Sequence, residues 1–123
     1  SIEGAKHGIR VNALAPTAAT RMTEGLLPAE VLQALSPEAV VPAMLVLASE
    51  QAPSRTILCA GAGTYEAAHI TLTHGEHLGL SPDTPERLLA ALAGVTARAG
   101  ETVPESGAAQ GTNEVAQALA ARR

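Results

Sequence analysis

Aromatic residues are almost absent from this sequence, which has no Phe and no Trp and contains Tyr65 alone. Its hydrophobic core must therefore be built from aliphatic side chains, without the large contact area that aromatic rings supply. Hydrophobic residues make up 46% and charged residues 16% of the chain, a balance typical of a packed protein rather than a disordered one. A length of 123 residues fits one small domain better than two independent ones.

Positive charge is also scarce: 8 Lys and Arg residues stand against 12 Asp and Glu residues, which gives a formal net charge of −4. The sequence has no basic stripe to neutralise phosphates, so we expect no nucleic-acid partner. No apolar run approaches the roughly 20 residues that span a bilayer, and no segment has the pattern of a secretion signal, so we expect no membrane partner. A single cysteine, Cys59, cannot form an internal disulfide and favours a reducing compartment. We therefore expect a cytoplasmic protein.

Two short aliphatic runs, residues 9–16 and 55–60, predict buried strands. Two helices are expected between them, one from Pro28 to Leu35 and an almost wholly apolar one from Ser36 to Ser49. This order favours a right-handed βαβ crossover. Two strands cannot cover both faces and both edges of a sheet, so we expect partner strands from a missing N-terminal segment or from another chain.

The composition changes to Ala, Glu, Arg and Gly from Ser81 onward. We expect one helix from Thr84 to Gly100, a linker over residues 101–111 and a last helix capped by Thr112 or Asn113. The predicted organisation is a first part over residues 1–80 and a helical C-terminal extension over residues 81–123. Residues 61–63 (Gly-Ala-Gly) predict a tight turn, because Glu66 stands where a dinucleotide fingerprint needs its third glycine.

The nine residues from Gly8 to Pro16 read Gly-Ile-Arg-Val-Asn-Ala-Leu-Ala-Pro. They resemble the penultimate core strand of short-chain dehydrogenases/reductases, in which the proline meets the nicotinamide. Thr17 replaces the usual glycine, and a Thr-Arg-Met-Thr run follows at residues 20–23. With Leu-Ser-Pro-Glu at residues 35–38, these features resemble the (3R)-hydroxyacyl-CoA dehydrogenase unit of type 2 multifunctional enzymes. The resemblance implies an α/β fold, namely the C-terminal portion of a Rossmann-like doubly wound parallel sheet with a helical tail.

The same resemblance implies an oxidoreductase that uses NAD or NADP to interconvert a secondary alcohol and a ketone, with a 3-hydroxyacyl-CoA type of substrate. The implied cofactor-binding positions are Pro16, Thr17, Ala18 and Ala19. The implied substrate-side loop contains Thr20, Arg21 and Met22.

Catalytic residues are not expected within this chain, because the serine and the Tyr-x-x-x-Lys pair of the resembled family precede the matching region. Tyr65 cannot replace that pair, since the position where the lysine is needed, four residues further on, holds His69. We therefore expect this segment to be inactive by itself, without turnover and with weak or undetectable cofactor binding.

Two alternative functions remain open at this point. One is a catalytically inactive relative of these dehydrogenases that serves as an assembly or binding module. The other is a metal-binding protein built on His69, His74 and His77, although their spacing fits no known zinc pattern and we predict no metal site. Whether the protein is an enzyme or an assembly module, we expect a homo-oligomer formed through the helix from Ser36 to Ser49 and the strand from Arg55 to Ala60.

Overall fold

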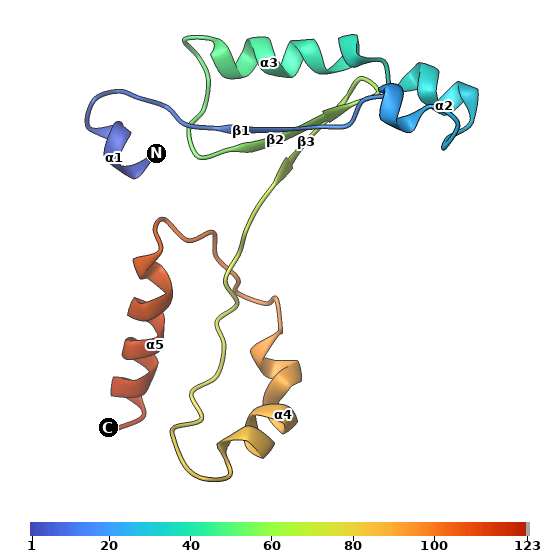
Figure 1. Cartoon of the computed structure of the whole chain (residues 1–123). Coiled ribbons are helices and arrows are strands. Elements are labelled where there is room, and N and C mark those ends of the chain that lie inside the picture. Colours follow the sequence, from blue (N-terminus) through green and yellow to red (C-terminus); the bar gives the residue numbers. More distant parts are fainter. Residues whose placement is uncertain (123) are drawn as a thin grey trace. The chain divides into compact units, whose positions relative to one another are not determined.

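The computed structural model describes residues 1–122 and divides the chain into two compact units, Ser1–His69 and a second that begins at Ile70. The first unit contains a sheet of three strands in the order β1-β2-β3 (Figure 1). Strands β1 (Ala13–Pro16) and β2 (Ile57–Gly61) are parallel, and β3 (Thr64–Ala68) pairs with β2 in the antiparallel direction. The parallel pair is the one that the sequence predicted, whereas the strand β3 was not placed at these residues.

Strand β1 begins at Ala13, four residues later than the pattern from Ile9 predicts. The cause is the side chain of Asn12, which makes two bonds to the segment before β2. Asn12 Nδ2 donates to the Pro53 carbonyl at 2.7 Å, and the Thr56 amide donates to Asn12 Oδ1 at 3.1 Å. An amide side chain thus takes over pairing that backbone groups would otherwise make, which explains the polar residue in an aliphatic run.

The connection between β2 and β3 is a tight hairpin turn, as the Gly-Ala-Gly sequence predicts. Ala62 and Gly63 both have positive φ, 50° and 73°, which is the conformation of a type I′ turn. This turn joins strands with matching twist, so Thr64 pairs directly with Gly61. A β-branched residue and Tyr65 immediately after the turn are strand formers, and they are the signal by which β3 was predictable.

The helices of the first unit are short. They are α1 (Ile2–Ala5), the 3₁₀ turns η1 (Arg21–Thr23) and η2 (Pro37–Val40), α2 (Ala29–Ala34) and α3 (Val41–Ala48). Helix α3 runs along one face of the sheet (Figure 1). The residues buried most deeply are three alanines, Ala43 on α3, Ala52 after it and Ala60 on β2, so the helix approaches the sheet closely through small side chains.

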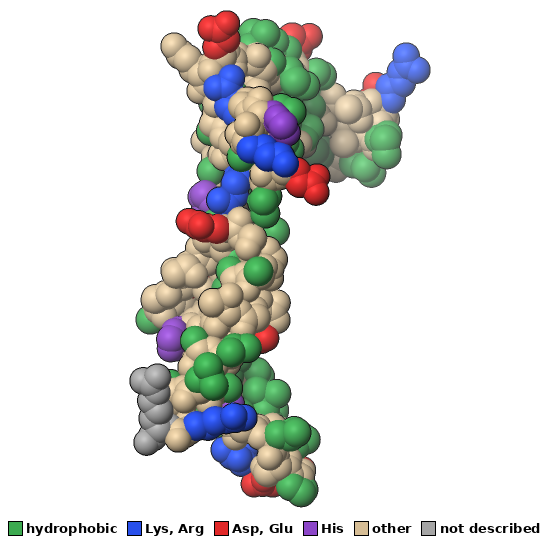
Figure 2. Space-filling view, turned by 90° about the vertical axis from the view of Figure 1, so that its left-hand side faces the viewer, with side chains coloured by type: hydrophobic (Ala, Val, Ile, Leu, Met, Phe, Trp, Pro, Cys, Tyr) green, Lys and Arg blue, Asp and Glu red, His purple; other side chains and the backbone are tan. Residues whose placement is uncertain are grey.

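The opposite side of α3 is open. Its exposed residues are large and apolar: Val41, Met44, Leu45 and Val46. The almost wholly apolar helix that the sequence predicts thus has one covered side and one open side among the described residues. Hydrophobic side chains, coloured green, are also open on the surface shown in Figure 2.

The core is small for the length of the chain. The accessible surface is 9292 Å² for a mass of 12.4 kDa, whereas two separate compact domains of half that mass would together expose roughly 7,400 Å². No described side chain is less than 2% exposed. Much apolar surface is thus left exposed, part of it on the helices α3 and α4.

The second unit consists of an extended arm that begins at Ile70 and two helices, α4 (Thr84–Val95) and α5 (Ala108–Ala120), with the arm between them in Figure 1. A single antiparallel bridge joins Leu72 to Thr102. Helix α4 ends before Gly100, and α5 begins within the predicted linker. Strong helix formers at its start, two alanines and a glutamine, account for the earlier beginning.

Candidate functional site

The candidate site lies where the parallel strands β1 and β2 end. Because both strands run in the same direction, Pro16 at the end of β1 pairs with Ala60 near the end of β2. The next amide, that of Thr17, donates to the Ala60 carbonyl at 2.8 Å. Ligands of open α/β sheets bind beyond the carboxyl ends of the strands. The predicted cofactor positions therefore leave the sheet at the edge where such a ligand is expected.

The loop after β1 is held at its other end by helix α2. The amide of Ala19 donates to the carbonyl of Leu35, the residue that caps α2, at 2.7 Å. Thr17 is exposed, while Ala18 and Ala19 are half-buried. With one anchor on β2 and one on α2, this loop has a defined path, and its small side chains leave its backbone open to a planar group.

A cleft of about 200 Å³ adjoins the loop. It is lined by residues of the loop, of the α2 cap, of β2 with its turn, and of β3: Thr17, Leu35, Cys59, Ala60, Gly61, Ala62, Thr64 and Glu66. Pockets that enclose a whole small molecule usually measure about 300–1,000 Å³. The cleft has room for part of a ligand, such as one ring, and the residues present fit the nicotinamide end of a dinucleotide rather than all of it.

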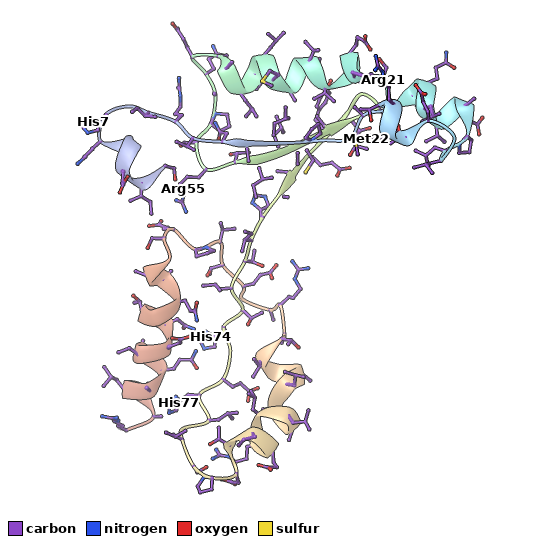
Figure 3. The ribbon with its side chains drawn as sticks, in the orientation of Figure 1. His7, Arg21, Met22, Arg55, His74 and His77 are labelled. Carbon is purple, nitrogen blue, oxygen red and sulfur yellow. The ribbon has the colours of Figure 1, made fainter. Side chains whose placement is uncertain are left out.

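The predicted substrate-side residues form the 3₁₀ turn η1, which directly continues this loop. The Thr20 amide donates to Thr23 Oγ1 at 2.9 Å, and the Thr23 hydroxyl donates to the Thr20 carbonyl at 2.8 Å. The Met22 amide donates to Thr20 Oγ1 at 3.2 Å. This capping box makes the turn rigid. Met22, labelled with Arg21 in Figure 3, is 87% exposed. An apolar side chain thus stands in solvent on a well-ordered turn.

The sequence patterns assigned no binding role to several residues near this edge. Leu35 anchors the loop, and Gly61 and Glu66 line the cleft, yet none belongs to a motif that marks its role. Tyr65, the single aromatic residue, donates its hydroxyl to the Ala39 carbonyl at 3.1 Å. This bond ties β3 to η2, which is a structural role.

Shifted pKa values are found for groups that are not among the residues lining the cleft. The Ser36 hydroxyl lowers the pKa of Glu38, and the Ser81 hydroxyl lowers that of Asp83. The pKa of Glu101 is lowered chiefly by its hydrogen bonds from Arg98. The first two carboxylates stand at helix starts, where a negative charge is favourable.

The histidines do not form a metal centre among residues 1–122, where no group of three His, Cys, Asp or Glu side chains is placed to hold a metal ion. His74 and His77 belong to the arm of the second unit and line a hollow of about 430 Å³ (Figure 3). The carbonyl of His74 accepts bonds from Asn113 at 3.1 Å and Gln117 at 2.7 Å. These bonds fix the arm against α5.

Among residues 1–122, none of the helices is both long and apolar enough to cross a membrane.

Comparisons with known proteins agree with the motif resemblance. The chain is 37% identical over 109 residues to a short-chain type dehydrogenase/reductase of Mycobacterium tuberculosis, covering 88% of this chain and 35% of that protein. It is 39% identical over 90 residues to the peroxisomal hydratase-dehydrogenase-epimerase of Saccharomyces cerevisiae, covering 71% of this chain and 10% of that protein. No protein-family model matches the chain.

Among solved structures, full-length peroxisomal multifunctional enzyme type 2 from Drosophila melanogaster matches with a TM-score of 0.75 and 23% identity. The match covers 99% of this chain and 22% of that one. The chain thus spans about a third or less of the length of these relatives. The predicted fold class, part of a Rossmann-like α/β sheet, is confirmed. Homology to short-chain dehydrogenases and to type 2 multifunctional enzymes is also confirmed.

Proposed function

We propose that this chain is the C-terminal part of an NAD(P)-dependent short-chain dehydrogenase/reductase that interconverts a secondary alcohol and a ketone. The observation that carries the proposal is the position of Pro16 and Thr17, which leave the sheet at its carboxyl edge beside a small cleft. The relatives are dehydrogenases, and their coverage by this chain is partial.

The role of this segment is to bind one end of the cofactor, the nicotinamide. Backbone groups of Thr17, Ala18 and Ala19 face the carboxamide edge, and Pro16 borders the ring. When bound, the nicotinamide accepts or supplies the hydride, while the chain described here holds it in place and excludes water from one side. The catalytic serine, tyrosine and lysine belong to a segment outside these 123 residues.

The proposed substrate class is a 3-hydroxyacyl-CoA thioester. Support comes from the Thr-Arg-Met-Thr run and from relatives whose names include a hydratase-dehydrogenase-epimerase. Thr20, Arg21 and Met22 form the substrate side of the site, with Met22 in contact with the acyl chain and Arg21 near a phosphate. The exposure of Met22 on a rigid turn favours this role, because an apolar side chain in solvent is available for an apolar ligand.

We also propose that residues 1–80 belong to the dehydrogenase domain and residues 81–123 to a helical extension. The complete protein is a homo-oligomer formed through the helix from Ser36 to Ser49 and the strand from Arg55 to Ala60. The open apolar side of α3 supports the helix part, whereas β2 is paired along both edges by β1 and β3. A cytoplasmic location stays a prediction; the yeast and fly relatives are named peroxisomal.

A chimaera tests the proposal directly. The chain replaces the matching segment of the mycobacterial relative, and NADH formation is followed with a 3-hydroxyacyl-CoA and with a simple secondary alcohol. We expect turnover with the thioester above that with the alcohol. A folded chimaera that binds NAD or NADP without turning over either substrate would contradict the enzyme and favour the inactive assembly module.

The isolated 123-residue chain gives the complementary test. We expect no turnover and only weak cofactor binding, seen as small NMR shifts of the Thr17 to Ala19 amides at millimolar NAD⁺. Tight binding in calorimetry would contradict the view that the phosphate-binding part lies elsewhere.

A further inference from the structure

Gly61, at the end of β2, stands against the loop that follows β1. We infer that Gly61 is a positioning residue for the nicotinamide: its missing side chain lets the Thr17 carbonyl rest on β2 and so sets the path of the cofactor loop. This inference rests on the proposed function and adds a residue that no motif of the sequence identifies with cofactor binding.

The contact is too close for any side chain. A Cβ atom at Gly61 would lie 2.8 Å from the Thr17 carbonyl oxygen and 3.0 Å from the Thr17 Cβ. Favourable non-bonded contacts of carbon atoms lie at about 3.5–4.0 Å, so both distances are repulsive. The nearest atom belongs to the backbone, which cannot rotate away as the end of a long side chain does.

Space, and not backbone conformation, requires glycine at this position. Gly63, in the turn, has φ of 73°, which disfavours other residues, but Gly61 lies in strand β2 and is not among the positive-φ residues. Alanine at position 61 is therefore compatible with the strand itself. Any effect of alanine there on the loop without ligand must therefore come from its contact with Thr17.

The loop after β1 cannot move away from a larger residue at position 61 without disturbing its hydrogen bonds. The Thr17 amide is bonded to the Ala60 carbonyl, the residue next to Gly61, and the Ala19 amide is bonded to Leu35. A shift of the Thr17 carbonyl away from position 61 strains both bonds. Because Thr17, Ala18 and Ala19 are the proposed nicotinamide contacts, the same shift moves backbone groups that face the carboxamide.

Amide hydrogen exchange on the intact 123-residue chain tests the steric part without any ligand. We compare the wild type with Gly61→Ala and with Gly111→Ala, a control in α5 at which a Cβ meets no atom within 4 Å. Gly61→Ala should speed exchange of the Thr17 amide at least about fivefold, the factor for losing one hydrogen bond. Gly111→Ala should leave it unchanged. Unchanged exchange in Gly61→Ala would overturn the inference.

Titration with NAD⁺ at millimolar concentration tests the cofactor part. The shifts of the Thr17, Ala18 and Ala19 amides should persist in Gly111→Ala and be lost in Gly61→Ala, while amides of α3 keep their wild-type positions. Shifts that survive in Gly61→Ala would overturn the positioning role. A wild type without shifts would overturn the cofactor part of the inference and leave the proposed function to the chimaera, and the ligand-free exchange result would still report on the contact itself.

A double variant separates the two contacts of Gly61. Adding Thr17→Gly to Gly61→Ala removes the Thr17 Cβ but keeps the carbonyl, which is the nearer atom. We expect the double variant to remain impaired in NAD⁺ binding. Full recovery would mean that the side-chain contact alone matters, and this would overturn the assignment to the carbonyl.

Discussion

The open side of α3 provides the sharpest prediction about assembly. Met44 and Leu45 are 56% and 66% exposed, although each is a large apolar residue on a well-formed helix. We expect replacement of both by glutamate to leave the fold of the chain intact, because neither side chain is deeply buried within it. The same change should abolish association through this helix.

The magnitude follows from the exposed fractions. Complete burial of a Leu or Met side chain contributes about 1.5–3 kcal/mol, so covering the open part of each is worth roughly 1–2 kcal/mol. A two-fold interface contains both residues twice, which gives roughly 4–8 kcal/mol in total. Losing the lower figure weakens a dimer about 1,000-fold, and burying new carboxylates weakens it further.

Sedimentation velocity over a range of concentrations measures this effect, with circular dichroism to confirm that the helix content is kept. Leu89→Glu serves as the control, since Leu89 lies on α4, is 74% exposed and is outside the proposed interface. If the wild-type chain sediments as a monomer at high concentration, or if the double variant associates as the wild type does, the assignment of the interface to α3 is wrong.

Three further predictions concern local structure. Replacing Asn12 by alanine removes its bonds to Pro53 and Thr56 and should lower the free energy of unfolding by about 1–3 kcal/mol; urea denaturation measures it, and an unchanged midpoint would refute the bridging role. Ala62 has φ of 50°, so Ala62→Gly should raise the free energy of unfolding by roughly 0.5–1 kcal/mol in the same assay, because glycine adopts this conformation without strain; destabilisation would contradict this. The pKa of Glu101 is lowered chiefly by Arg98, so its stabilising contribution is complete above its ordinary pKa of 4.5 and disappears as the pH falls through the lower folded value. Carboxyl NMR should place its titration below the ordinary value in the wild type and nearer to it in Arg98→Ala, and identical titrations would exclude the pairing.

The parallel pair of strands was predictable because its signal is local. Aliphatic runs closed by Pro16 and by the glycines after Ala60 indicate buried strands, and the helices between them require a parallel crossover. The position of the loop proposed to bind the cofactor follows from the same pattern. It comes directly after a strand that ends at the carboxyl edge, and the motif from Gly8 to Pro16 identified the family.

The tertiary structure alone decided which groups touch across the chain. Asn12 shortens β1 by bonding to residues more than 40 positions away, and Gly61 meets Thr17 across a comparable separation. Neither contact leaves a periodic signal, since each depends on a single pair of atoms in space. The sequence by itself determined the class of fold and the edge at which a ligand is expected, because hydrophobic periodicity and turn residues act locally; the shape of that edge depends on long-range packing, which local patterns do not encode.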